Sequence, residues 1–387
     1  MPRPTSNREL IALISLGSLA LGGMNFSACD TGSTSGTDTA DASTTDGSSS
    51  DGSSTTASYT KDTSAAANDA AILAAASAFK SSLTAAQQTT VQLDYNLTNA
   101  RQWSNLPTTA VKRNGVALID MDANAQSKAI ALATAAASAA GSTLLSELRL
   151  ADQYLVTNGG ASATDYGQGR YYFAFVGTPS ATSPWMLQVA GHHLAYNFSF
   201  NTKCTSATPL FDAVEPLTWT DTASHAPLET QRAAMTALLG SISSLPGAQL
   251  SGTYTDIISG PAGMTGDSKF PNISYPTGST ARGVAGSALS AAQRTLLKQA
   301  IEAWVKLSGD PVSVSLLASY ESDSALDATY VGFTGSTDLT TQASYARIDG
   351  PRVFIEFTVQ GGIVYRNKVH YHTIWRDKVA DYGAEFQ

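Results

Sequence analysis

Basic residues are scarce in this chain. Lysine and arginine together number 23 among 387 residues, against 31 aspartates and glutamates, and the formal net charge is −8. No basic run occurs anywhere in the sequence. The electrostatic footprint of nucleic-acid binding is therefore missing, and we expect no nucleic-acid partner.

The common enzyme signatures are also missing. The chain has no G-x-S-x-G elbow, no H-E-x-x-H helix, no G-x-x-x-x-G-K-[ST] loop and no paired C-x-x-C. Ser77-Ala-Phe-Lys80 matches S-x-x-K, but the partner motifs of penicillin-interacting serine enzymes do not follow it. No reaction can be assigned from a motif alone.

The first residues read as an export signal. Two arginines precede the apolar stretch Leu10–Leu21, which is too short to span a bilayer comfortably. The stretch runs into Phe26-Ser27-Ala28-Cys29, which resembles a bacterial lipobox. We expect residues 1–28 to be a signal peptide and Cys29 to be the lipidation site, with ordinary secretion as the alternative. The protein would then belong to the cell envelope, anchored through its lipid to a membrane on the periplasmic or outer surface.

Residues 29–61 are almost entirely Ser, Thr, Asp, Gly and Ala, with no aliphatic side chain larger than alanine to offset the entropy cost of ordering. We expect a solvated, disordered tether, followed by a single globular domain over residues 62–387. If Cys29 carries lipid, Cys204 is the only remaining thiol. No intramolecular disulfide is then expected, so stability must come from core burial.

The globular part predicts an α+β fold. N-terminal helices should pack with a mostly antiparallel β-sheet, and further helices should lie between the central and C-terminal strands. Apolar residues spaced by three and four from Ile72 to Leu83 predict a helix, whereas Trp185 to Phe200 alternates as one long strand. Three C-terminal segments predict an antiparallel meander: 344–348, 352–359 and 363–375.

Four of the five histidines form two tight groups on predicted strands, His192-His193 and His370-Tyr-His372. In an extended strand, His370 and His372 point to one face with about 6.8 Å between their α-carbons, so both imidazoles can turn toward one ion. Adjacent His192 and His193 point to opposite faces, unless Gly191 introduces a bulge. We favour His193 as the third ligand and His192 as a hydrogen-bonded core histidine.

Three readings of these histidines stay open. They can ligate a divalent metal, with zinc the first choice and iron or copper the alternatives. They can form a metal-free ligand or catalytic site, or they can be purely structural. A carboxylate from Glu356 or Asp377 would complete the metal shell in the first reading.

The order of motifs resembles a known bacterial family. The matching segments are Arg101 with Trp103, Tyr171–Ser180, Pro184-Trp185, Gly191–Leu194 with Asn197, Ala207–Phe211, Tyr345–Pro351, Ile355-Glu356, and His370–Asp377 with Asp381–Gly383. In this order they resemble domain of unknown function family 3500. The resemblance covers essentially everything after the tether and supports a shared site around the four histidines, without implying a reaction.

The chain departs from that family at two places. Thr358 and Val359 stand where the family usually shows Asp-Asn, and Val369 replaces the Asn before the first histidine of H-x-H. If the missing groups support a metal, this member has altered metal affinity or activity.

The leading hypothesis from the sequence is an envelope-anchored, metal-dependent enzyme, a hydrolase in the simplest case. Glu356 or Asp377 would act as general base, and Arg376 would hold a small anionic substrate bidentately. The alternative is an envelope lipoprotein that binds a small ligand without turnover.

Overall fold

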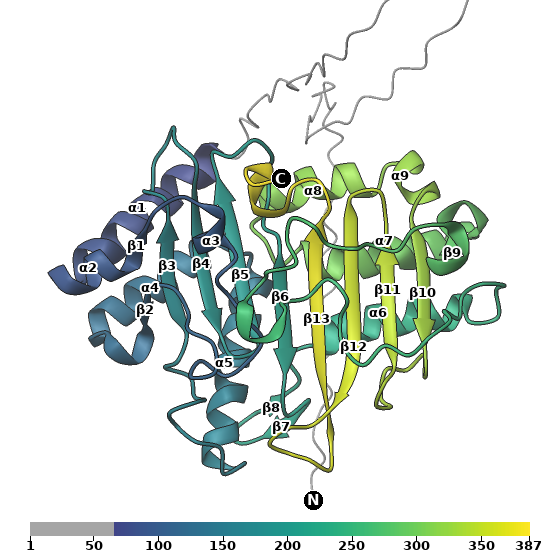
Figure 1. The fold of residues 1–387 in the computed structure, drawn as a ribbon, viewed down its shortest axis with the longest axis horizontal. Coiled ribbons are helices and arrows are strands. Elements are labelled where there is room, and N and C mark those ends of the chain that lie inside the picture. The colour runs from purple at the N-terminus through teal and green to yellow at the C-terminus, as the bar shows by residue number, and fades with distance from the viewer. Residues whose placement is uncertain (1–65) are drawn as a thin grey trace, which may run out of the picture.

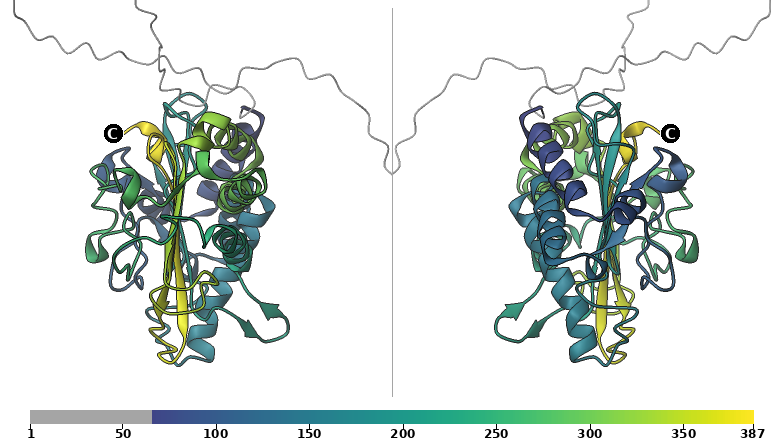
Figure 2. Two further views of the ribbon diagram at one scale, coloured as in Figure 1. Left: turned by 90° about the vertical axis from the view of Figure 1, so that its right-hand side faces the viewer. Right: turned by 90° about the vertical axis from the view of Figure 1, so that its left-hand side faces the viewer.

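The computed structural model describes residues 66–387 and shows an α+β fold. One long mixed sheet runs across the whole width of the described part, and its longer helices cover one face (Figures 1 and 2). The opposite face is covered by irregular segments, which include Trp103 packed against Phe211. We call these two surfaces the helix face and the loop face.

The sheet has the strand order β1-β3-β4-β5-β6-β13-β12-β11-β10-β9, with β2 paired to β3. Its two halves meet where β6 pairs antiparallel with β13, so the middle of the chain lies beside its C-terminal end. The strands of this sheet are β1 Gln92–Leu93, β2 Val116–Ala117, β3 Tyr172–Val176, β4 Trp185–Gly191, β5 Leu194–Phe200, β6 Leu210–Val214, β9 Val284–Ala285, β10 Tyr330–Thr334, β11 Tyr345–Asp349, β12 Val353–Gly361 and β13 Val369–Asp377. A separate ribbon pairs β7 Trp219–Thr220 with β8 Ser224–His225.

The helices fall into an N-terminal group and a group between the central and C-terminal strands. They are α1 Ala66–Ser82, α2 Ala85–Val91, α3 Leu97–Ala100, α4 Ala123–Ala136, α5 Ala139–Thr157, α6 Glu229–Ile242, α7 Ala291–Val305, α8 Asp310–Tyr320 and α9 Asp323–Asp327. This arrangement confirms the predicted fold class. No helix in the described range is both long enough and apolar enough to cross a membrane.

The helices form where the spacing of apolar residues and the capping motifs predict them. Ile72, Phe79 and Leu83 are all buried, as their spacing predicts. The ring of Phe79 lies edge-on to Phe173 and Phe175 of β3, with centroids 5.9 Å away in each case. Helix α7 starts with a complete capping box at Ser290, and Trp304 near its end donates its indole N–H to Thr373 on the sheet at 2.8 Å.

The expected long strand from Trp185 to Phe200 is wrong. The chain folds back at His192-His193, so this segment is a two-residue hairpin between β4 and β5. His193 occupies the left-handed region with φ 60°, where histidine is more readily tolerated than most residues. Gly191 is required before the turn, because a Cβ there would lie 2.7 Å from the ring of Tyr171.

Only one of the two cysteines lies in the described part of the chain. Cys29, together with the expected signal peptide and the whole of the expected tether, lies outside the described residues. Cys204 lies within the described range and is buried.

Two glycines give opposite predictions for stability. Gly115 has φ +79°, and a Cβ there would lie 1.9 Å from the carbonyl oxygen of Phe173. Gly115→Ala should lower the free energy of unfolding by about 2–4 kcal/mol in a denaturant titration. The control is Gly240, in the exposed part of α6, where a Cβ meets nothing within 4 Å. Gly240→Ala should raise stability by up to about 1 kcal/mol, and equal effects at the two positions would contradict this packing.

Candidate metal centre

The two histidine groups converge on the loop face of the sheet. His370 and His372 lie two residues apart on β13 and point to that face, as their spacing predicts. His372 is paired across the sheet with Ala213 of β6. On the other side of β6, the backbone N–H of Ala213 donates to the carbonyl oxygen of His193 at 2.8 Å. Ala213 therefore lies between His193 and His372, and its methyl group leaves room for their rings to meet above it.

Three histidines form one compact group, which we call the histidine centre: His193, His370 and His372. One ring nitrogen from each lies within 4.8 Å of the others. The Nε2 atoms of His370 and His372 are 3.0 Å apart, and the ring of His193 lies 5.5 Å and 5.2 Å from those of His370 and His372. A tetrahedral zinc ion at ~2.0–2.1 Å from two imidazole nitrogens separates them by roughly 3.3 Å. The pair on β13 is therefore close to the spacing that metal ligation needs.

The electrostatics keep two of these rings neutral, those of His193 and His370. Burial, followed by the neighbouring rings of His192, His372 and His370, lowers the pKa of His193 well below its ordinary value. Burial and then His372 and His192 lower the pKa of His370 to about 3. Neutral imidazole is the form that binds a metal ion, so both side chains are ready as ligands at neutral pH.

Asp256 supports the centre from a position that the sequence did not single out. Its Oδ1 lies 3.2 Å from Nδ1 of His372, which leaves Nε2 of the same ring for a metal. Burial opposes the effect, but the hydrogen bond with His372 lowers the pKa of Asp256, so this carboxylate is ionised. Its side chain is 48% exposed at the end of a polar loop, and neither motif nor periodicity marks it in the sequence.

His192 lies beside the centre without being part of the three-histidine group. Its ring stacks on His193 with centroids 3.6 Å apart, and its Nδ1 lies 2.7 Å from Oδ1 of the buried Asp152 on α5. Asp152 thereby fixes the tautomer and orientation of His192, leaving its Nε2 as an acceptor. The three-histidine group thus contains His193 and not His192.

Glu356 lies on the same face but is occupied by other partners. It is fully buried and accepts hydrogen bonds from the backbone N–H groups of Ile258 and Ser259, the hydroxyl of Ser259 and the hydroxyl of Tyr345. The expected role of Glu356 as general base therefore has no geometric support. Its observed contacts anchor the segment that follows Asp256.

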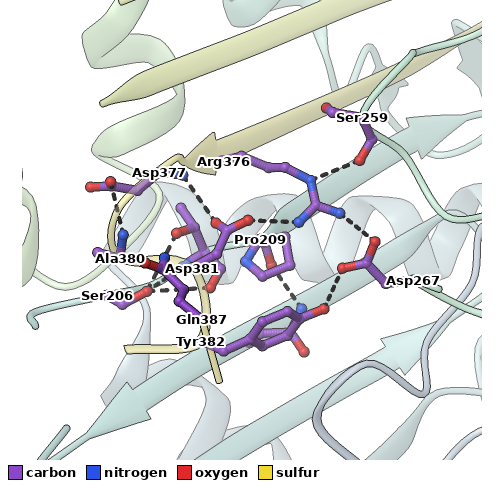
Figure 3. Close-up of polar contacts among 12 residues, drawn as sticks. Ser206, Pro209, Ser259, Asp267, Arg376, Asp377, Ala380, Asp381, Tyr382 and Gln387 are labelled. Atoms are coloured by element: carbon purple, nitrogen blue, oxygen red, sulfur yellow. Dashed lines mark hydrogen bonds and ion pairs between the residues drawn. The ribbon is translucent and has the colours of Figure 1, made fainter. Parts of the chain in front are cut away.

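Arg376 is likewise committed to buried partners. Its guanidinium bonds Asp267 and Asp381, at 2.5 and 2.6 Å, while Nε donates to the carbonyl oxygen of Ser259 at 2.7 Å (Figure 3). Arg376 is fully buried, so the structure does not place it for binding an anionic substrate. It ties the loop at Ser259 and the C-terminal turn to β13.

Asp377 points away from the histidines. It lies one residue beyond Arg376 on β13 and therefore faces the helix side, where its carboxylate bonds Tyr320 at 2.7 Å and Arg352 at 2.6 Å. Asp377 is thus not brought to the histidine centre, either as a ligand or as a base. The alternation of the strand excludes a common face for His372 and Asp377.

The comparisons with known proteins identify a family and nothing beyond it. A family model described as "Protein of unknown function (DUF3500)" matches residues 65–384. No curated protein and no solved structure matches the chain.

The position of Arg376 gives a stability prediction. Arg376→Met leaves the carboxylates of Asp267 and Asp381 buried without their cation, which should cost about 3–5 kcal/mol in the free energy of unfolding. Adding Asp267→Asn and Asp381→Asn to this variant should recover part of the loss, because the buried like charges are then gone. A loss below about 1 kcal/mol for Arg376→Met alone would show that the ion pairs do not hold these segments.

Proposed function

Because the chain belongs to the DUF3500 family, whose description assigns no function, we propose a function from the site itself. The protein binds one divalent transition-metal ion through His193, His370 and His372. The observation that carries this proposal is the convergence of three buried imidazoles, from a hairpin turn and a distant strand, within 4.8 Å of one another. Imidazole suits zinc, iron and copper, and zinc is the first choice for a three-histidine set.

The contacts around the centre support this assignment. His372 has a carboxylate on the nitrogen that faces away from the other ligands, which is the usual arrangement around metal-bound histidines. His193 is fixed by its backbone bond to Ala213 and by stacking on His192. Two of the three ligands, His193 and His372, are therefore oriented by neighbours rather than by the metal alone.

The finer proposal is a metal-dependent hydrolase. A three-histidine set leaves one coordination position for water, whose pKa the metal lowers toward neutrality. Asp256 and His192 are the polar groups next to the ligands, since Glu356 and Asp377 are bonded elsewhere. Asp256 orients His372, and Asp152 holds His192 so that its Nε2 can accept a proton.

One observation favours the alternative of a metal- or ligand-binding protein without turnover. The three rings of the centre are between 1% and 7% exposed. A substrate could reach them only if neighbouring segments moved, and the polar loop 251–256, whose last residue contacts His372, is one such segment. A binding protein has no such requirement.

We also propose that the chain is a lipoprotein of the cell envelope, on the strength of the Phe26–Cys29 lipobox and the apolar leader before it. The chain has two cysteines, so a disulfide within one chain would need the sulfur of Cys29, which a thioether-linked lipid would already occupy. Lipidation of Cys29 and such a disulfide therefore exclude each other.

Metal content tests the histidine centre. Protein purified without a metal-chelating tag should carry close to one equivalent of a transition metal, measured by inductively coupled plasma mass spectrometry. The His370→Ala, His372→Ala double variant should lose it, because two of three ligands are gone.

The matched control is His225→Ala. His225 lies outside the centre and pairs with Glu147 and Asp221 at 2.8 and 3.0 Å. Its variant should keep the metal. Unchanged metal content in the double variant, or an equal loss in both, would overturn the assignment.

Lipidation has its own test. In a bacterial host, the chain should incorporate labelled palmitate and sediment with the membranes. Cys29→Ser should abolish both results, and Cys204→Ser should leave the labelling unchanged. A secreted, unlabelled wild-type protein would show that the leader serves ordinary export.

A further inference from the structure

A groove beside the histidine centre carries an unusual balance of charge. A cavity of ≈ 610 Å³ is lined by Thr255, Gln342, Gln360 and Arg366, among others. A second cavity of ≈ 530 Å³ shares Gln342 and Arg366 with the first and adds Lys368. Because they share these two residues, the cavities form one groove around Arg366, at the end of the sheet where β12 turns into β13. We call it the Arg366 groove.

The lining of this groove contains two cations and no carboxylate. Arg366 and Lys368 are both exposed, and neither forms an ion pair with a described residue. The whole chain, by contrast, has a net charge of −8. A concave surface lined by one sign of charge concentrates ions of the opposite sign, so the Arg366 groove favours anions over the rest of the surface.

The groove adjoins the histidine centre through two hydrogen-bonded residues. Gln360 is the cross-strand partner of His370, and its amide donates to the carbonyl oxygen of Thr255 at 3.0 Å. Thr255 directly precedes Asp256, which contacts His372. Two residues that line the groove, Gln360 and Thr255, are therefore direct neighbours of residues in or beside the histidine centre.

We propose that the Arg366 groove binds a small molecule with a carboxylate or phosphate group and holds it next to the histidine centre. Arg366 supplies the planar pair of donors that such groups accept, Lys368 adds charge, and the amide of Gln342 can bond a neighbouring polar group. The sequence assigned the anion to Arg376, but that guanidinium is occupied by Asp267 and Asp381. Arg366 takes its place.

A role of the bound anion as a substrate rests on the proposed metal centre, whereas binding of the anion in the groove does not. The groove itself is defined by its own residues. Binding of an anion and binding of a metal can therefore be measured separately, and each can fail without the other.

The test is isothermal titration calorimetry of the mature chain with inorganic phosphate and with malonate at low ionic strength, where screening is weak. The Arg366→Gln, Lys368→Gln double variant should bind at least one of the two probes on the order of tenfold more weakly than wild type. Its zinc affinity should not change, because no ligand of the histidine centre is altered.

The matched control is Lys112→Gln, Lys128→Gln, which removes the same charge from two exposed lysines outside the groove. Its anion affinity should equal that of wild type. The proposal is overturned if wild type binds neither probe, if the groove variant binds both as well as wild type, or if the control loses as much affinity. Loss of zinc from the His370→Ala, His372→Ala variant, measured in parallel, reports on the metal centre alone.

Discussion

The histidine centre depends on the packing of side chains across a single strand. β6 separates β5 from β13, and only a small side chain at position 213 allows rings from both neighbours to meet on the loop face. His193 reaches this point because the hairpin turns immediately before β5, and His372 because it pairs with Ala213. Without this juxtaposition the histidines would be separate polar groups buried at a cost in stability.

Two buried charges on the same face support the centre indirectly. Glu356 binds the backbone just after Asp256, and Arg376 binds the carbonyl oxygen of Ser259. Together they fix the segment that brings Asp256 to His372. Glu356 and Arg376, which look catalytic in the sequence, thus anchor this segment. Such a structural role is consistent with the complete burial of both side chains and requires no substrate.

Much of the fold could be predicted from local pattern. The helix from Ile72 to Leu83, the capping box at Ser290 and the C-terminal meander follow from periodicity and turn chemistry, which act over a few residues. The pairing of His370 with His372 on one face followed from strand geometry in the same way. The turn at His192-His193 could not be predicted, because apolar residues continue on both sides and the only turn residue, Gly191, precedes it.

Contacts across long sequence distances also escaped prediction. Asp256 lies 116 residues from His372, in a polar loop that carries no signal of its own. Arg366 and Arg376 look equivalent in the sequence, and only the positions of Asp267 and Asp381 show that one is neutralised by carboxylates. Tertiary packing, rather than composition, decides which charged groups remain available.

The central claim is that His193, His370 and His372 bind one metal ion together. Anomalous diffraction at the zinc absorption edge, from crystals grown with zinc, tests it most directly. One peak is expected about 2.0–2.1 Å from a ring nitrogen of each of the three histidines. A peak elsewhere, or none near these rings in well-ordered density, would contradict it.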